Sequence, residues 1–420
     1  MHDFSYHGGI LHCGDVRLDR IAREVGTPFY CYSMPTLVRH IEAFEEPYKA
    51  IDHQTCFAMK ANSNLAILSL MTRYGLGADV VSGGELYKAT KAGIPADKIV
   101  YSGVGKTTEE IDMAISAGIM MFNIESQQEL EVINARAGEL GRKAPISIRV
   151  NPDVDPRTHP YISTGLRSHK FGIDIEASTT QYLRAREMDH IEIVGIDCHI
   201  GSQLTEVRPF IDAVERLKIL IEELAQRGIV FRYLDLGGGL GITYSDEQPP
   251  HPREYGKAII DTVSGLGMTL IFEPGRVIVG NAGILVTRVL YRKETPEKTF
   301  IVVDAGMNDL IRPALYGAYH EILPVERKAP ETRTEKADVV GPICESSDFL
   351  AKDRDLPVLA RGDLIAVMSA GAYGFTMSSN YNSRPRPPEV LVDGDAYSVI
   401  FKRQTYEDLV AGEMIPDTLR

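Results

Sequence analysis

Short apolar runs alternate with amphipathic stretches along residues 27 to 276. The apolar runs have the length and the branched side chains of buried strands, whereas the longer stretches repeat with helical spacing. The predicted strands are 55–59, 78–81, 99–101, 119–124, 146–150, 191–198, 231–236 and 269–272. The predicted helices between them include 85–92, 108–117, 127–140, 210–227 and 252–266. This alternation predicts a parallel sheet, and its eight strands favour a closed (β/α)8 barrel over the alternative, a doubly wound open sheet.

The pattern changes after residue 276. Strand-like runs follow one another with few helices between them, which indicates an all-β second domain, a β-sandwich or β-barrel. They are 284–292, 299–303, 338–341, 363–368, 389–392 and 397–402. The first residues carry a strand-like segment and a short helix at 18–25. We therefore predict a barrel over 27–276 and a β domain over 277–420, and we expect 1–26 not to form a domain of its own.

Composition excludes several classes of partner. Of the 420 residues, 44% are hydrophobic and 25% are charged, as in ordinary globular proteins. A net charge of −13 argues against nucleic acids and anionic membranes as main partners. Five scattered cysteines without a CxxC pair support neither a disulfide framework nor a zinc site. With no signal-like start and no long apolar run, we expect a cytoplasmic protein that acts on a small molecule.

Polar residues follow almost every predicted barrel strand, at the edge where barrel enzymes carry their chemistry. Lys60 ends the first strand; it is either a solvated flank or an amine in a cavity, where desolvation lowers the pKa and allows an imine with an aldehyde. Asp79 ends the second strand. Both positions become more informative when the later strands are considered.

The run DLGGGLGI ends the seventh strand and contains Gly238 and Gly239. Its glycines make either a tight turn or a phosphate cradle of backbone N–H groups, to which Ser202 could add a hydroxyl. His199, after the sixth strand, is either a structural histidine or an imidazole stacked on a cofactor ring. It has no neighbouring metal-ligand spacing.

Glu273 ends the eighth strand in FEPGR, followed by Gly275 and Arg276. A salt bridge to Arg276 that only holds the turn is one interpretation. The other is a carboxylate that keeps a pyridine nitrogen protonated, which makes the ring a strong electron sink. An imine-forming lysine, a phosphate cradle, a stacking histidine and this carboxylate together indicate pyridoxal phosphate.

The β domain contributes further candidates. In GPICESSD, Cys344 is either a small buried residue or a proton donor, and Glu345 lies beside it. Tyr373 lies in a glycine-rich loop. Arg312 and Tyr316 are spaced to share one helix face, and arginine suits bidentate carboxylate binding, although a surface charge is the simpler interpretation of Arg312.

The motifs, in order, resemble those of the diaminopimelate decarboxylase family, whose members are fold type III pyridoxal-phosphate enzymes. They are GTPFYCYS, FAMKANSN, ADVVSGGEL, SGVGKT, FNIES, RVNP, KFGI, CHIGSQ, DLGGGLGI, EPGR, GPICESSD and SRPRPPEVLV, and they span nearly the whole chain. The departures are small, namely Cys56 in place of a frequent aromatic residue and Thr243 where proline is expected.

The resemblance implies a role for each candidate. Lys60 would carry pyridoxal 5'-phosphate, His199 would stack on its ring, Glu273 would contact the ring nitrogen and Cys344 would donate a proton. The cofactor-binding set would be Lys60, Asp79, His199, Ser202, Gly238, Gly239, Glu273, Gly275, Arg276 and Tyr373. The substrate-binding set would be Arg276, Arg312, Tyr316, Glu345 and Tyr373.

The resemblance also implies that the strands before residue 27 join the C-terminal β domain, so that 1–26 and 277–420 form one β domain. It further implies a reaction and an assembly. The reaction is decarboxylation of meso-2,6-diaminopimelate to L-lysine and carbon dioxide, the last step of lysine biosynthesis. The assembly is a head-to-tail homodimer in which Cys344 and Glu345 complete the partner's site. The alternatives are a decarboxylase of ornithine, arginine or carboxynorspermidine, a racemase on the same fold, and a non-catalytic homologue.

Overall fold

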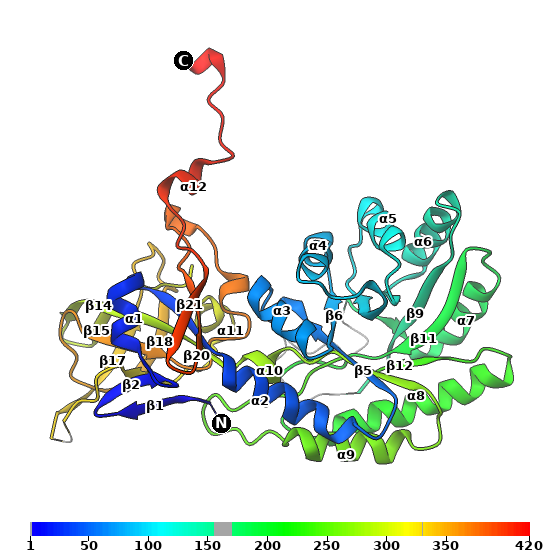
Figure 1. Ribbon diagram of the computed structural model, residues 1–420, viewed down its shortest axis with the longest axis horizontal. Helices are drawn as coiled ribbons and strands as arrows, with labels where there is room; N and C mark the ends of the chain where they lie inside the picture. The colour runs from blue at the N-terminus through cyan, green and yellow to red at the C-terminus, as the bar shows by residue number, and fades with distance from the viewer. Residues whose placement is uncertain (1, 155–169, 330) are drawn as a thin grey trace. The chain divides into compact units, whose positions relative to one another are not determined.

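The computed structural model describes residues 2–154, 170–329 and 331–420 (Figure 1). The chain divides into two compact units. One, the barrel unit, comprises His40–Thr243 and Glu247–Ile278, and the other, the β unit, comprises Met1–Arg39, Tyr244–Asp246 and Val279–Arg420. The two units are described in turn.

The barrel unit contains a ring of parallel strands in which each strand pairs with the next and the last returns to the first. In ring order they are β5 (His53–Ala58), β6 (Gly77–Val80), β7 (Ile99–Tyr101), β8 (Met121–Ile124), β9 (Ala144–Asn151), β11 (Ile191–Asp197), β12 (Tyr233–Asp235) and β13 (Thr269–Phe272). A short extra strand, β10 (Ile173–Asp174), pairs with β9. The pairing of β13 with β5 closes the barrel, so all eight carboxyl ends meet at one rim.

Helices follow most of the strands and lie outside the ring (Figure 1). They are α3 (Leu65–Arg73), α4 (Gly83–Lys91), α5 (Thr108–Ala117), α6 (Gln127–Glu139), α7 (Ile175–Arg186), α8 (Arg208–Gln226) and α9 (Pro252–Val263). Ser82, Thr107 and Ser126 cap the N-termini of α4, α5 and α6 through their hydroxyls, which fixes where the strand-to-helix loops end. Gly118 ends α5 with φ +70°, as a left-handed cap requires.

The β unit is built on a mixed sheet in the order β18–β17–β15–β14–β4–β20–β21, with β19 paired to β14 and β16 paired to β19. The strands are β4 (Phe29–Ser33), β14 (Gly283–Glu294), β15 (Thr299–Val303), β16 (Ile322–Pro324), β17 (Thr334–Val340), β18 (Phe349–Pro357), β19 (Leu364–Val367), β20 (Glu389–Asp393) and β21 (Ala396–Phe401). A three-stranded sheet of β1 (Phe4–His7), β2 (Ile10–Cys13) and β3 (Val16–Arg17) packs with α1 (Leu18–Val25) into the same hydrophobic core. The remaining α-helices are the short α10 (Arg276–Val279), α11 (Arg312–Tyr316) and α12 (Tyr406–Val410) and the longer α2 (Met34–Glu45). Helices α2 and α10 cross the boundary between the two units.

The predicted fold class is confirmed: a closed parallel (β/α)8 barrel accompanies a β domain. The first boundary lies later in the chain than residue 27, because β4 pairs with β14 and β20 in the β unit. The helices named from the sequence did not include α2, α3 or α7, and the strands predicted for the β domain did not include β4, β16 or β18. In α3 the apolar residues cover more than one face, so the periodicity is weak, and β18 carries the charged segment 352–355 of an edge strand. In the described ranges, we find no helix that is both long and apolar enough to span a bilayer.

Candidate active site

Lys60 lies at the rim of the barrel, in the short 3-10 turn Met59–Ala61 that directly follows β5. Its Nζ donates to Oδ2 of Asp79 at 2.6 Å, and Asp79 is fully buried in the neighbouring strand β6. In the parallel register of β5 and β6, Ala58 lies opposite Asp79. Lys60 follows Ala58 by two residues, and its side chain therefore reaches that of Asp79. The lysine therefore pairs with a buried carboxylate, a contact that the sequence did not indicate.

His199 follows β11 and is held by the glycine loop after β12. The backbone N–H of Gly238 donates to His199 Nδ1 at 3.0 Å, so the neutral ring carries its proton on Nε2. Burial lowers the pKa of His199, and the positive charges of Arg149 and Lys60 lower it further. The side chain is therefore a neutral imidazole in the cofactor-free protein.

The glycines of this loop are required by close backbone contacts. A Cβ on Gly238 would lie 2.2 Å from the carbonyl oxygen of Glu273, and one on Gly239 would lie 2.6 Å from that of Gly201. Gly239 also has φ +120°, which side chains rarely adopt. The loops after β11, β12 and β13 thus form one backbone cradle, and Arg276 Nη2 donates to Ser202 Oγ at 3.0 Å beside it.

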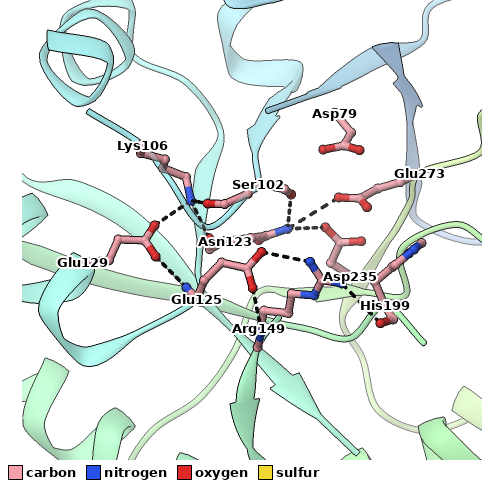
Figure 2. Close-up of polar contacts among 12 residues, drawn as sticks. Asp79, Ser102, Lys106, Asn123, Glu125, Glu129, Arg149, His199, Asp235 and Glu273 are labelled. Atoms are coloured by element: carbon pink, nitrogen blue, oxygen red, sulfur yellow. Dashed lines mark hydrogen bonds and ion pairs between the residues drawn. The ribbon is translucent and has the colours of Figure 1, made fainter. Parts of the chain in front are cut away.

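Glu273, at the end of β13, belongs to a buried polar network inside the barrel (Figure 2). The side-chain amide nitrogen of Asn123 lies 3.5 Å from Glu273 Oε1, 3.2 Å from Asp235 Oδ2 and 3.1 Å from Ser102 Oγ. Asp235 also accepts the backbone N–H of Gly237 at 2.9 Å. One amide therefore links two carboxylates from neighbouring strands and fixes their orientation.

The same region contains more buried carboxylates than it can easily keep ionised. Burial raises the pKa of Glu273, the charges of Asp235 and Asp79 raise it further, and Lys60 and Arg149 oppose this shift. Burial, followed by the charge of Asp197, raises the pKa of Asp235 to about 8. Such a cluster favours a cation placed among its carboxylates.

Two buried ion pairs lie near the same carboxyl ends of the strands (Figure 2). Arg149 Nη1 donates to Glu125 Oε1 at 2.9 Å, and its Nη2 reaches the carbonyl oxygen of His199 at 3.4 Å. Lys106 Nζ donates to Glu129 at 2.6 Å and to the carbonyl oxygen of Asn123 at 2.9 Å. These pairs fix the loops that carry His199 and Asn123.

The raised pKa of Asp235 predicts that the cofactor-free protein loses stability as the pH rises. The ordinary aspartate pKa is 3.8, so between about pH 4 and about pH 8 the folded protein keeps a proton that the unfolded chain has released. The contribution of this proton to folding stability is fully present below the ordinary pKa of 3.8, and it is lost as the pH rises through the folded-state pKa of about 8. Asp235→Asn removes this titration, so its urea-unfolding midpoint should fall less than that of the wild type between about pH 5.5 and about pH 8.

Asp112 provides the control for this experiment. Arg136 lowers the pKa of its carboxyl, so its stabilising contribution is present above the ordinary pKa and disappears only in acid. Asp112→Asn should therefore shift the midpoints at both pH values equally. An Asp235→Asn protein with the same pH slope as the wild type would contradict the raised pKa.

Most residues that the sequence singled out for the cofactor lie in the barrel unit. These are Lys60, Asp79, His199, Ser202, Gly238, Gly239, Glu273, Gly275 and Arg276, and they occupy the loops after β5, β11, β12 and β13 and the strand β6. Sequence analysis missed Asn123 and Asp235 as site residues. Asp235 lies two residues before the first glycine of the run, and Asn123 lies one residue before the end of β8, so their positions near strand ends were the available signals.

The remaining candidates lie in the β unit. Arg312 and Tyr316 share α11, as their spacing predicted, and Arg312 is only 6% exposed, which excludes the surface-charge interpretation. Cys344 is exposed rather than a small core residue, and its backbone N–H donates to Asn382 at 2.8 Å. Glu345 accepts the hydroxyl of Tyr381. Tyr373 has φ +56° in its loop, and the roles of all these side chains stay predictions.

The barrel residues match the aldehyde, the phosphate and the ring nitrogen of pyridoxal phosphate. Lys60 offers an amine to the aldehyde, the glycine loop has no side chain that would keep a phosphate from its backbone, and Glu273 offers a carboxylate to the ring nitrogen. The buried Oδ1 of Asp79 has no hydrogen-bond partner among the described residues. It is a further carboxylate oxygen that favours a positively charged group at this site. Fold and site together define the barrel class of pyridoxal-phosphate enzymes.

Comparison with known proteins supports this class and narrows it. Residues 34–280 match the family model described as pyridoxal-dependent decarboxylase, pyridoxal binding domain. A diaminopimelate decarboxylase of Pseudomonas aeruginosa is 53% identical over 415 residues, which cover 99% of each chain. The crystal structure of the Helicobacter pylori diaminopimelate decarboxylase with L-lysine matches with a TM-score of 0.90 and 44% identity, covering 94% of this chain and 98% of that chain.

A third relative is the structure of the M. jannaschii diaminopimelate decarboxylase with L-lysine, which matches with a TM-score of 0.95 and 40% identity over 100% of both chains. The chain therefore belongs to the diaminopimelate decarboxylase family. Its cofactor is pyridoxal phosphate, and it is a carboxy-lyase.

Proposed function

We propose that this protein decarboxylates meso-2,6-diaminopimelate to L-lysine and carbon dioxide, in the last step of lysine biosynthesis. Membership of the family supports the reaction. The observation that carries it in this chain is the cluster of Lys60, Asp79, His199 and Glu273 at one rim of the barrel, where each group matches one requirement of the cofactor.

The cofactor supplies an electron sink for the electron pair that stays behind when the bond to the carboxylate breaks. Lys60 binds the cofactor through its amine, and Asp79 orients that amine. Gly238, Gly239, Ser202 and the Gly275–Arg276 turn hold the phosphate, with Tyr373 nearby, and the neutral imidazole of His199 covers the ring without adding charge.

Glu273 holds a proton at the ring nitrogen, and Asn123 with Asp235 fixes its carboxylate for that contact. An arginine or a neutral side chain in place of Glu273 would give a weaker electron sink, as the ring nitrogen would lose its proton. This arrangement favours full loss of a carboxylate over racemisation, and it argues against a racemase.

The β-unit residues, together with Arg276 of the barrel unit, select the substrate and finish the reaction. Arg276, Arg312, Tyr316, Glu345 and Tyr373 bind the distal amino-acid end, so the centre of D configuration is the one that reacts. Cys344 then returns a proton to the carbon that has lost its carboxylate. Its exposure in the single chain supports a homodimer in which Cys344 and Glu345 complete the partner's site. Sedimentation of the loaded enzyme at the monomer mass would contradict this assembly, and the cytoplasmic location stays a prediction.

The test of this function is carbon dioxide release from three substrates, namely meso-diaminopimelate, its L,L isomer and ornithine. We expect release from the meso compound alone, because the L,L isomer has no D centre and ornithine has no distal amino-acid end. Faster release from ornithine would favour the alternative, a decarboxylase of ornithine, arginine or carboxynorspermidine. Racemised product without carbon dioxide would indicate a racemase, and an inactive protein that binds no cofactor would indicate a non-catalytic homologue.

A further inference from the structure

Arg312, which we assign to the substrate's distal carboxylate, is held inside the β unit by two side chains. Its Nη1 lies 3.0 Å from Nε2 of His320, and its guanidinium carbon lies 4.7 Å from the centre of the Tyr244 ring. The rings of Tyr244 and His320 meet edge to face at 5.4 Å. All three side chains are buried, and His320 is fully so.

The backbone fixes the protonation pattern of His320. Its Nδ1 lies 2.8 Å from the carbonyl oxygen of Met368, which can only accept, so Nδ1 carries a hydrogen. In the neutral ring Nε2 then has a free lone pair, which matches an N–H of Arg312 as the donor. The antiparallel register of β16 with β19 pairs Ile322 with Val367, and the Met368 N–H donates to the carbonyl oxygen of Glu321 at 2.9 Å, so the next residue, His320, lies beside Met368.

A neutral hydrogen-bond acceptor can orient an arginine side chain without neutralising its charge, whereas a carboxylate does both. Arg149, in the barrel unit, is equally buried, and Glu125 neutralises it at 2.9 Å. The imidazole of His320 fixes one N–H of Arg312 but cancels none of its charge. His320 therefore orients the guanidinium without supplying a negative charge of its own, which suits a site for an incoming carboxylate.

We propose that His320 is a positioning residue for substrate binding, which orients the Arg312 guanidinium toward the distal carboxylate of the substrate without neutralising it. This inference rests on the proposed function. The product L-lysine keeps that carboxylate, whereas cadaverine has the same chain and amines without it. The two ligands therefore separate an effect on carboxylate binding from a general disturbance of the site.

The experiment measures binding of L-lysine and of cadaverine to the cofactor-loaded enzyme by calorimetry. His320→Leu removes the acceptor, and we expect it to weaken L-lysine binding by about 10- to 100-fold, as for a lost hydrogen bond to a charged group. Cadaverine binding should change by less than about threefold. KM for meso-diaminopimelate should rise with the L-lysine dissociation constant, while kcat stays within about threefold.

His320→Gln keeps an acceptor oxygen in the same direction and should recover most of the loss. His53→Leu is the matched control, because His53 likewise contacts a backbone carbonyl and a second side chain but lies at the start of β5, away from the carboxyl ends of the strands. In an Arg312→Met background, His320→Leu should have no further effect on L-lysine binding, because His320 acts through Arg312.

Two results would overturn the inference: an L-lysine affinity unchanged in a folded His320→Leu enzyme, or equal losses for L-lysine and cadaverine. Folding is checked by the thermal midpoint and by the absorbance of the bound cofactor. If the wild type releases carbon dioxide and only the His320 effect is missing, this inference alone fails. If no carbon dioxide is released but L-lysine binding still depends on His320, the proposed function fails and the inference stands.

Discussion

Lys60→Ala is expected to lower turnover of meso-diaminopimelate by at least about 10⁴-fold, the size of effect seen when a covalent catalytic group is removed. Lys60 supplies an amine that pairs with the buried Asp79 at the barrel rim. Without it, the cofactor loses its covalent anchor and the product loses the amine that releases it. The measurement is carbon dioxide release at saturating substrate, with cofactor absorbance recorded in parallel.

Lys98→Ala is the control for this variant. Lys98 precedes β7, at the amino ends of the strands, and its Nζ donates to the carbonyl oxygen of Gly75 at 2.9 Å. Turnover by Lys98→Ala should equal that of the wild type. Retention of turnover or of the imine absorbance by Lys60→Ala would contradict the assignment of Lys60.

Glu273→Gln should lower kcat by about 10²- to 10³-fold, the usual cost of losing one preorganised electrostatic group. Glutamine keeps the size of the side chain and its contact with Asn123, but it cannot hold a proton at the ring nitrogen. The same change removes a carboxylate whose pKa is raised by burial, so the cofactor-free variant should be more stable than the wild type near pH 8. Activity and stability should therefore move in opposite directions.

Two measurements check the Glu273 prediction, namely kcat with saturating cofactor and the urea-unfolding midpoint of the cofactor-free protein. A parallel fall in both would indicate that the variant is simply misfolded. A kcat within about threefold of the wild type would show that Glu273 does not tune the ring, and the electron-sink argument would then be wrong.

The barrel could be predicted because the same pattern, a short apolar run followed by an amphipathic helix, is repeated along the chain. Each strand is a short buried run, and several helices end in glycine, as at Gly118, so errors in single elements do not change the fold class. The domain boundary near residue 27 was harder to predict from the sequence. The strand Phe29–Ser33 is fully buried, and its partners, β14 and β20, are more than 200 residues away, so local pattern gave no indication of which sheet it joins.

The site was predictable where chemistry needs a particular residue at a strand end, as for Lys60, His199 and Glu273. Asn123 and Asp235 were harder to identify, because their importance depends on a contact between strands β8 and β12 across the barrel interior. His320 gave no signal at all. Its role follows from which of its two ring nitrogens faces a carbonyl and which faces Arg312, and only coordinates provide that information.

The account depends on a covalent link between Lys60 and the cofactor aldehyde. The most direct test is to reduce the loaded enzyme with borohydride, digest it and locate the pyridoxyl group by mass spectrometry. The account predicts one labelled peptide, with the label on Lys60. A label on a different lysine, or a reduced protein from which the cofactor dialyses away, would contradict it.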